Sequence, residues 1–166
     1  TIIIGAKTEK GAIAKMKAAT LCLVPTRILL HQWYDEVSKV YEGGVGRLGD
    51  GARRARPITV ATYESAYRHM HRLGQVFQLL VVDEAHHFGN GQRDETLEMS
   101  VAPWRLGLTA TPITSVTALD NNRRLIGAEV YRLGMLDLVG GYLAELELCT
   151  LEVELDADER RRYDAE

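Results

Sequence analysis

The chain has 166 residues, of which 46% are hydrophobic and 26% charged. This is the composition of an ordinary globular domain and excludes a disordered or collagen-like chain. The formal net charge of −3 argues against a strongly basic nucleic-acid binder of the histone type. The charge is uneven, because residues 1–75 have a net charge of +6 and residues 76–166 a net charge of −9. Such asymmetry fits either an anionic partner or chance clustering of solvated charges.

Short apolar runs alternate with helical patterns along most of the chain. In chain order, they predict a strand at 2–4, a helix at 9–19, a strand at 21–24, a helix at 26–41, a strand at 58–61, a helix at 63–73, a strand at 77–82, a short helix at 94–100 and a strand at 105–109. Continuous apolar strands separated by helices indicate an α/β fold with a parallel sheet sandwiched between helices. Ligands bind such sheets at the carboxyl ends of the strands.

The end of the chain follows a different pattern. Residues 145–155 alternate between apolar side chains and mainly acidic ones, as a half-exposed strand does, and Asp156 is suited to cap a short charged helix. We therefore expect one domain over residues 1–145, followed by an exit strand and helix over residues 146–166.

The cysteines and the lack of long apolar runs in the sequence bear on where the protein is located and on whether it binds zinc. Cys22 and Cys149 are too few for a disulfide framework, and they show no zinc-ligand spacing with the histidines. No run approaches the roughly 18 apolar residues of a membrane span. We expect an intracellular protein, cytoplasmic and nucleoid-associated or nuclear, with no membrane partner.

The strongest signal for chemistry follows the predicted strand at 77–82. There the run Asp83-Glu84-Ala85-His86 places two adjacent carboxylates at a strand end. Adjacent side chains of an extended chain point in opposite directions, so the two carboxylates can divide two tasks. Asp83 can hold Mg²⁺ through a coordinated water, and Glu84 can orient the water that attacks a γ-phosphate. A surface acidic pair that caps a helix would show the same residues.

A second run, Leu106 to Pro112, places the hydroxyls of Thr109 and Thr111 at the next strand end. These hydroxyls can bond to the two carboxylates or to His86, and so relay the state of the nucleotide to the rest of the domain. The order and spacing of the two runs disfavour a plain turn before Pro112.

Taken together, these runs resemble motifs II and III of superfamily 2 helicases. Three further runs resemble elements of the XPB-like DNA repair helicases: residues 23–33 are similar to motif Ia, 58–67 to the T-Y-x-S-A-Y element and 99–109 to the approach to motif III. Residues 158–163 resemble the entry to the linker of that family. The resemblance covers most of the chain and implies the first RecA-like motor domain, of the DEAH type, of an ATP-dependent DNA helicase or translocase.

The resemblance also implies cofactors, partners and further site residues. ATP and Mg²⁺ are the implied cofactors, with Glu84, Asp83 and His86 at the hydrolysis site. DNA is the implied partner, bound through its backbone without sequence preference, and the residues that match the DNA contacts of the family are Pro25, Thr26, Arg27, Thr62 and Tyr63. A second RecA-like domain would supply the arginine fingers, so we expect weak turnover from these 166 residues alone. A repair or nuclease protein is a further possible partner.

The phosphate loop departs from the family pattern. Lys7 and Thr8 fit the end of a G-K-T loop, where they would bind phosphate and stand beside Mg²⁺, but Ala6 follows Gly5 where a glycine is expected. The loop is either shortened and functional, with Gly5, Ala6, Lys7 and Thr8 as the nucleotide-binding residues, or degenerate. A degenerate loop would favour a RecA-like module that binds DNA or protein without turnover. A third reading is the motor domain of a restriction enzyme.

Two further groups of side chains are open to interpretation. Arg53, Arg54 and Arg56 form a basic cluster in a glycine-bearing stretch, which we expect to be a loop that either contacts DNA or is only solvated. Trp33 and Trp104 lie in apolar runs, so we expect them to pack in the core rather than to stack on bases.

Overall fold

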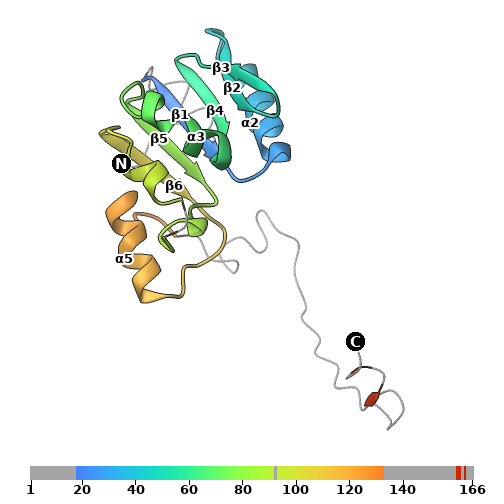
Figure 1. Ribbon diagram of the computed structural model, residues 1–166, viewed down its shortest axis with the longest axis vertical. Helices are drawn as coiled ribbons and strands as arrows, with labels where there is room; N and C mark the ends of the chain where they lie inside the picture. The colour runs from blue at the N-terminus through green and yellow to red at the C-terminus, as the bar shows by residue number, and fades with distance from the viewer. Residues whose placement is uncertain (1–17, 92, 133–159, 162, 164–166) are drawn as a thin grey trace. The chain divides into compact units, whose positions relative to one another are not determined.

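The computed structural model in Figure 1 describes residues 18–91, 93–132, 160–161 and 163. The chain divides into two units, Thr1–Val130 and Tyr131–Glu166, and all the elements below lie in the first. The predicted strands at 2–4 and 145–155 lie outside the described residues. Of the predicted helix at 9–19 only residues 18 and 19 are described, and they are not helical.

The elements follow one another as strands and helices in close agreement with the sequence pattern. Their bounds are β1 Thr20–Val24, α2 Arg27–Val40, β2 Val45–Gly49, β3 Ala52–Arg54, β4 Ile58–Thr62, α3 Tyr63–Leu73, β5 Leu79–Asp83, the single-turn 3₁₀ helix η1 Ala85–His87, α4 Glu95–Glu98, β6 Trp104–Leu108 and α5 Val116–Leu125. Among the described residues, none of the helices is long and apolar enough to cross a bilayer.

The six strands form one sheet in the order β3-β2-β4-β1-β5-β6. β1 lies at its centre and pairs in parallel with β4 and with β5, while β2 and β6 extend the parallel sheet on the two sides. Only β3, which pairs with β2, is antiparallel. The carboxyl ends of five strands therefore meet at the same edge of the sheet, which we call the carboxyl edge.

Helices cover both faces of the sheet because each central strand is apolar on both sides. In β1, Leu21 and Leu23 pack into one core cluster with α3, whereas Cys22 and Val24 pack into another with α2. Alternate residues of a strand point to opposite faces, so this division places α2 on one face and α3 on the other. The expected α/β class, a parallel sheet sandwiched between helices, is confirmed.

Three features differ from the sequence prediction. The stretch 45–54 forms the β2–β3 hairpin, so Arg53 and Arg54 lie on a strand and not in a loop. The run Val45–Gly49 contains two glycines and an arginine, and its strand structure depends on pairing with β4 rather than on a continuous apolar pattern. The polar helix α5 was also missed.

The expected burial of the two tryptophans is confirmed for Trp33 and wrong for Trp104. Trp33 is 3% exposed on the inner face of α2, whereas Trp104 is 45% exposed. Trp104 begins β6, which is the outermost strand on its side of the sheet in the part of the chain that the structure describes. A side chain there can remain in solvent even within an apolar sequence run.

Candidate functional site at the carboxyl edge of the sheet

Four strands bring most of the candidate residues to the carboxyl edge. Pro25, Thr26 and Arg27 follow β1, and Thr62 and Tyr63 end β4 and begin α3. Asp83 ends β5, with Glu84 to His86 directly after it, and Thr109 follows β6. Gly5, Ala6, Lys7 and Thr8 lie outside the described residues. The parallel register explains this gathering, since Val24 pairs with Thr62, and Asp83 with Leu108.

The carboxylate of Asp83 is held on both of its oxygens. Oδ2 accepts a hydrogen bond from the indole Nε1 of Trp33 at 2.8 Å, and Oδ1 accepts one from the backbone N–H of Glu84 at 3.2 Å. Nearby, burial and, to a lesser extent, the charge of Asp83 raise the pKa of the Cys22 thiol to about 12. The Cys22 thiol therefore stays protonated beside the fixed Asp83 side chain.

Glu84 has a backbone conformation that its side chain does not favour. Its φ of +53° and ψ of +49° lie in the left-handed region, which is uncommon for residues other than glycine. The hydroxyl of Tyr63 donates to the carbonyl oxygens of both Asp83 and Glu84, the latter at 3.2 Å. Burial raises the pKa of Tyr63 well above its ordinary value, and the charges of the Asp83 and Glu84 carboxylates add to the shift.

The side chain of Glu84 ends in a buried oxygen that makes no hydrogen bond. Oε2 is buried without a hydrogen bond, although His86 Nδ1 lies 3.3 Å away. The same Nδ1 lies 2.8 Å from the Thr109 hydroxyl. Because Nδ1 faces a carboxylate oxygen and a hydroxyl oxygen, the proton of a neutral His86 belongs on Nδ1.

The two threonines of the second run have different surroundings. The Thr109 hydroxyl contacts His86 and also the backbone of Thr111, whose N–H lies 3.1 Å from it and whose carbonyl lies 3.0 Å from it. Thr111 takes part in these bonds through its backbone. The contact between the second run and His86 is therefore present at Thr109.

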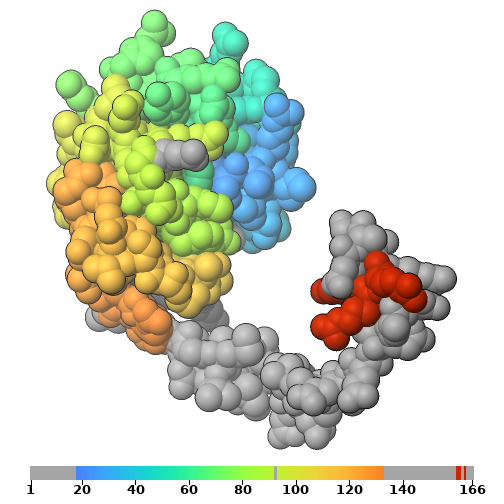
Figure 2. All heavy atoms as spheres, turned by 60° about the horizontal axis from the view of Figure 1, so that its bottom comes forward, coloured from blue at the N-terminus to red at the C-terminus, as the bar shows by residue number. Residues whose placement is uncertain are grey.

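Helix α5 clamps the segment that follows Asp83 and Glu84, a role that the sequence did not reveal. The buried Asn122 donates from Nδ2 to the carbonyl oxygens of Ala85, at 2.8 Å, and Phe88, at 3.4 Å, while Asn121 donates to that of Gly89 at 3.0 Å. Figure 2 shows α5, in orange, packed along the surface of the domain. An asparagine pair in a polar stretch for which the sequence predicts no element carries no signal of this kind.

Two further features fix the same segment. Gly89 has a φ of +90°, and a Cβ there would lie 2.5 Å from the backbone oxygen of Ala118 in α5. Asp94, which is 7% exposed, accepts hydrogen bonds from the backbone N–H groups of Gly89 and Gly91 at 2.8 and 2.9 Å. Glycine at position 89 thus allows the helix to approach the loop closely.

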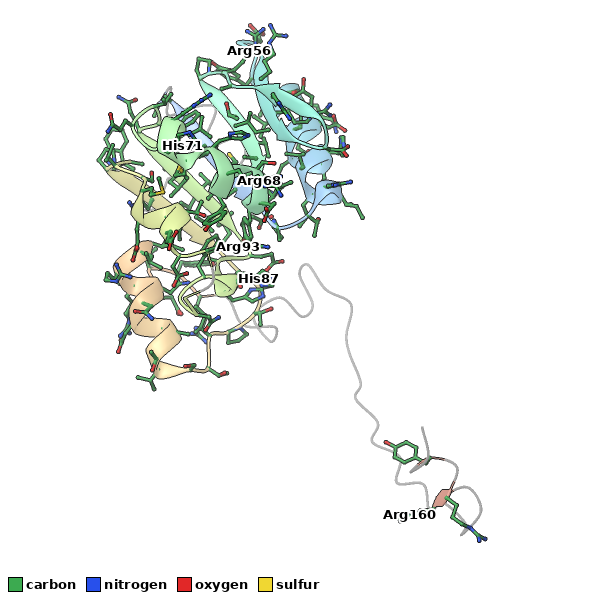
Figure 3. The ribbon with its side chains drawn as sticks, viewed as in Figure 1. Arg56, Arg68, His71, His87, Arg93 and Arg160 are labelled. Atoms are coloured by element: carbon green, nitrogen blue, oxygen red, sulfur yellow. The ribbon has the colours of Figure 1, made fainter. Side chains whose placement is uncertain are left out.

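A hollow of about 330 Å³ lies at the carboxyl edge between the segments that follow β1, β4 and β5. Its lining residues are Pro25, Thr26, Tyr63, His87, Phe88 and Arg93. Figure 3 shows His87 and Arg93 near the same end of the sheet, while Arg56 lies at the opposite end. Of the three arginines in the predicted basic cluster, Arg56 is thus remote from this hollow.

The hydroxyls of Thr26 and Thr62 cap the helices that begin at this edge. Thr26 accepts from the Leu29 N–H at the start of α2, and Thr62 accepts from the Ser65 N–H at the start of α3, each at 3.2 Å. Two helix N-termini, with their partial positive charge, therefore face the carboxyl edge. Because the side chains of Thr62 and Tyr63 are engaged within the chain, any DNA contact there would involve the backbone.

A polar cluster continues the edge on the α2 side. Asp50, in the β2–β3 turn, lies 2.8 Å from His31 Nε2 and 3.7 Å from Arg27, and Arg47 lies 3.1 Å from His31 Nδ1. The pKa of Asp50 is lowered chiefly by its hydrogen bond to His31. The positive charges of His31, Arg27 and Arg47 lower it further. Arg27 thus stands at this edge with a nearby acid and with most of its side chain in solvent.

The donor set at this edge suits Mg²⁺ better than a metal held by protein ligands alone. No three His, Cys, Asp or Glu side chains gather as ligands within the described ranges. Mg²⁺ keeps several waters and binds through one or two carboxylates together with the phosphates of a nucleotide. The carboxylates of Asp83 and Glu84 fit that pattern.

Comparisons with known proteins match this chain to a restriction-enzyme subunit family and to DNA helicases and translocases of the XPB type. The family described as "Type III restriction enzyme, res subunit" matches residues 1–114. The DNA 3'-5' translocase XPB2 of Sulfurisphaera tokodaii is 38% identical over 152 residues, and the DNA 3'-5' helicase XPB of Kineococcus radiotolerans is 30% identical over 165 residues. Each alignment covers 92% of this chain, but only 35% and 29% of those proteins, so the chain spans about a third of their length.

A solved structure supports the fold independently. The SWI2/SNF2 ATPase core of Sulfolobus solfataricus, solved with double-stranded DNA, matches 70% of this chain and 27% of its own with a TM-score of 0.57 at 22% identity. The family match covers more than half of the chain. The chain therefore belongs to the family of the type III restriction enzyme res subunit, and within it is the first RecA-like motor domain of an XPB-like superfamily 2 helicase.

Proposed function

We propose that this domain binds ATP with Mg²⁺ and hydrolyses the ATP when DNA occupies the carboxyl edge, as the motor of a DNA helicase or translocase. The observation that carries the proposal is the pair of carboxylates after β5. Asp83 is fixed by two hydrogen bonds, and beside it Glu84 presents a buried oxygen that makes no hydrogen bond and lies 3.3 Å from His86 Nδ1. A buried carboxylate oxygen without a hydrogen bond is costly, and an attacking water would satisfy it.

Each carboxylate then has one task. Asp83 would hold Mg²⁺ through a water, together with Thr8, while Gly5, Ala6 and Lys7 would bind the phosphates. When bound, Mg²⁺ would neutralise charge on the phosphate oxygens. Glu84 would accept a hydrogen bond from water through Oε2 and orient that water for attack.

His86 and the second run would report the state of this site. The proton on His86 Nδ1 faces both Glu84 and the Thr109 hydroxyl. A change in the charge or hydration of Glu84 would alter this hydrogen bond and so affect the loop that contains Thr109 and Thr111. We assign these two threonines to coupling on that basis.

DNA would bind at the hollow beside the N-termini of α2 and α3. Helix N-termini and backbone N–H groups bind phosphate without reading sequence. Pro25, Thr26 and Tyr63 line the hollow, Arg27 is exposed beside it, and Thr62 caps α3 there. The names of the relatives state movement in the 3'-5' direction, and we propose the same direction here.

The proposed engine includes a second motor domain. We propose that residues 1–145 form the first motor domain and that residues 146–166 lead to the second, which supplies arginine fingers worth about 10³–10⁵ in rate. Repair is the process that the XPB name suggests, and a repair or nuclease protein remains a proposed partner.

Nucleotide titration of the full-length protein tests the proposal. We expect wild type to bind Mg-ATP and Lys7→Ala to lose most of that binding, with ATP hydrolysis stimulated by DNA in wild type alone. Lys39→Ala is the matched control, because Lys39 lies on the outer face of α2 and pairs with Glu36. If wild type and Lys7→Ala bind Mg-ATP equally poorly, the domain is a binding module without turnover and the proposal fails.

A further inference from the structure

Two aromatic side chains reach the strand end of Asp83 and Glu84 from opposite faces of the sheet. Trp33 belongs to the core cluster on the α2 face, and Tyr63 belongs to the cluster on the α3 face. Trp33 donates to the Asp83 carboxylate, and Tyr63 donates to the carbonyl oxygens of Asp83 and Glu84. The motifs of the sequence assign neither contact.

Trp33 acts on the side chain of Asp83, whereas Tyr63 acts on the backbone of Glu84. The indole N–H of Trp33 bonds to Oδ2 at 2.8 Å, so it selects one rotation of the Asp83 side chain and leaves lone pairs on both oxygens for metal-bound waters. The Tyr63 hydroxyl instead holds the backbone of Glu84 in its left-handed conformation. That backbone conformation decides where the Glu84 carboxylate lies.

Both aromatic rings are fixed by packing and cannot easily follow a displaced carboxylate. Trp33 is 3% exposed and Tyr63 is 4% exposed. The Tyr63 ring also packs edge-on against Phe88, with the centroids 4.7 Å apart and the planes at 64°. Each donor therefore comes from a rigid element, α2 or α3.

The geometry points to Trp33 and Tyr63 as positioning residues of the hydrolysis site: Trp33 orients the Mg²⁺ carboxylate of Asp83, and Tyr63 holds the backbone turn that presents Glu84. This inference rests on the proposed function. It goes beyond that function because these residues neither touch the nucleotide nor belong to the carboxylate motif. α2 and α3 begin at the proposed DNA contacts, so a shift of either helix on DNA would reach the two carboxylates directly.

The test of Trp33 uses the only other tryptophan of the chain as its control. In the full-length protein, Trp33→Phe keeps an aromatic ring and removes the N–H donor, while Trp104→Phe makes the same change at an exposed position of β6. We expect Trp33→Phe to raise the Mg²⁺ concentration for half-maximal ATP hydrolysis about tenfold, as loss of a side chain that orients a metal ligand does. Trp104→Phe should leave it unchanged.

A fluorescence measurement tests the same contact without relying on catalysis or on the folding of Trp33→Phe. In Trp104→Phe, with any tryptophan outside residues 1–166 also replaced by phenylalanine, Trp33 is the only tryptophan. We expect Mn²⁺ with ATP to quench its emission, and Asp83→Asn to reduce that quenching strongly. Unchanged emission on Mn²⁺-ATP binding, or a Trp33→Phe protein with the wild-type Mg²⁺ requirement, would overturn the role of Trp33.

Tyr63→Phe tests the second role, with Tyr67→Phe on the exposed side of α3 as its control. We expect Tyr63→Phe to lower kcat about tenfold at saturating Mg²⁺, with little change in KM for ATP or in the Mg²⁺ requirement, since Asp83 keeps its indole partner. A purely structural role would lower Tm without this separation. Failure of wild type itself to bind Mg-ATP would instead refute the proposed function, so the two failures are distinguishable.

Discussion

The two loops that carry the candidate chemistry are held in very different ways. The segment from Asp83 to Gly91 is fixed by side chains from α2, α3 and α5 and by Asp94. The loop from Thr109 to Ser115 is mostly exposed, and its side-chain contact to the first segment runs from Thr109 to His86. The first loop is thus prepared for chemistry before any ligand binds.

This difference suggests that one loop of a motor domain catalyses hydrolysis while the other responds to the result. A site that orients water gains from preorganisation, because its dipoles need not rearrange during the reaction. A loop that reports the outcome needs two accessible states, and exposed segments with few buried contacts open at low free-energy cost. The contact between Thr109 and His86 is a place where one loop can influence the other. The following predictions test this division.

The largest effect is expected at the water-orienting carboxylate. Glu84→Gln keeps the size of the side chain but replaces the charged acceptor, so ATP binding should persist while hydrolysis falls about 10³-fold. Steady-state phosphate release by the full-length protein measures this, with Glu98→Gln, an exposed residue of α4 that pairs with Arg124, as control. Unchanged release would remove Glu84 from the mechanism.

The next effect concerns the clamp on the fixed loop. Asn122→Ala leaves the buried carbonyl oxygens of Ala85 and Phe88 without their donor, so we expect the free energy of unfolding to fall by about 2 kcal/mol. Asn121→Ala removes one bond at a half-buried position and should cost about 1 kcal/mol or less. Urea denaturation compares the two. Equal decreases in the free energy of unfolding would mean that Asn122 does not anchor α5 to the loop.

The contact between the loops should affect coupling more than stability. Thr109→Val removes the hydroxyl that faces His86 at an exposed position, so the free energy of unfolding should change by about 0.5 kcal/mol or less. The stimulation of ATP hydrolysis by DNA should nevertheless fall severalfold. Thr111→Val should have the smaller effect, because Thr111 meets Thr109 through its backbone. A full stimulation in Thr109→Val would break the proposed link.

The smallest effect is a pH dependence at the edge of the sheet. The folded pKa of Asp50 is lowered, chiefly by the hydrogen bond to His31, so its stabilisation is present above the unfolded value of about 4 and is lost as pH falls through the folded pKa. Asp50→Asn should lower Tm slightly at pH 7, and this difference should shrink as pH falls below the unfolded value of about 4. Asparagine tolerates the φ of +50° at this position, so the comparison isolates the charge. A Tm difference that persists at low pH would assign the effect to the backbone.

The sequence by itself determined the class of the fold and the location of the chemistry. Continuous apolar runs such as those of β1, β4 and β5 require burial on both faces, and this requirement alone predicts a parallel sheet between helices. The carboxylates of Asp83 and Glu84 were found because they directly follow such a run. Their motifs depend only on local order along the chain.

The tertiary structure decided what holds these residues in place. Trp33, Tyr63 and Asn122 come from helices distant in sequence, and nothing in their local patterns shows that they donate to the segment after β5. Pairing with β4 likewise makes a strand of the glycine-containing run Val45–Gly49, and the end of the sheet leaves Trp104 in solvent. Local patterns encode which faces are apolar, whereas hydrogen bonds between distant elements and exposure at a sheet edge depend on how those faces assemble.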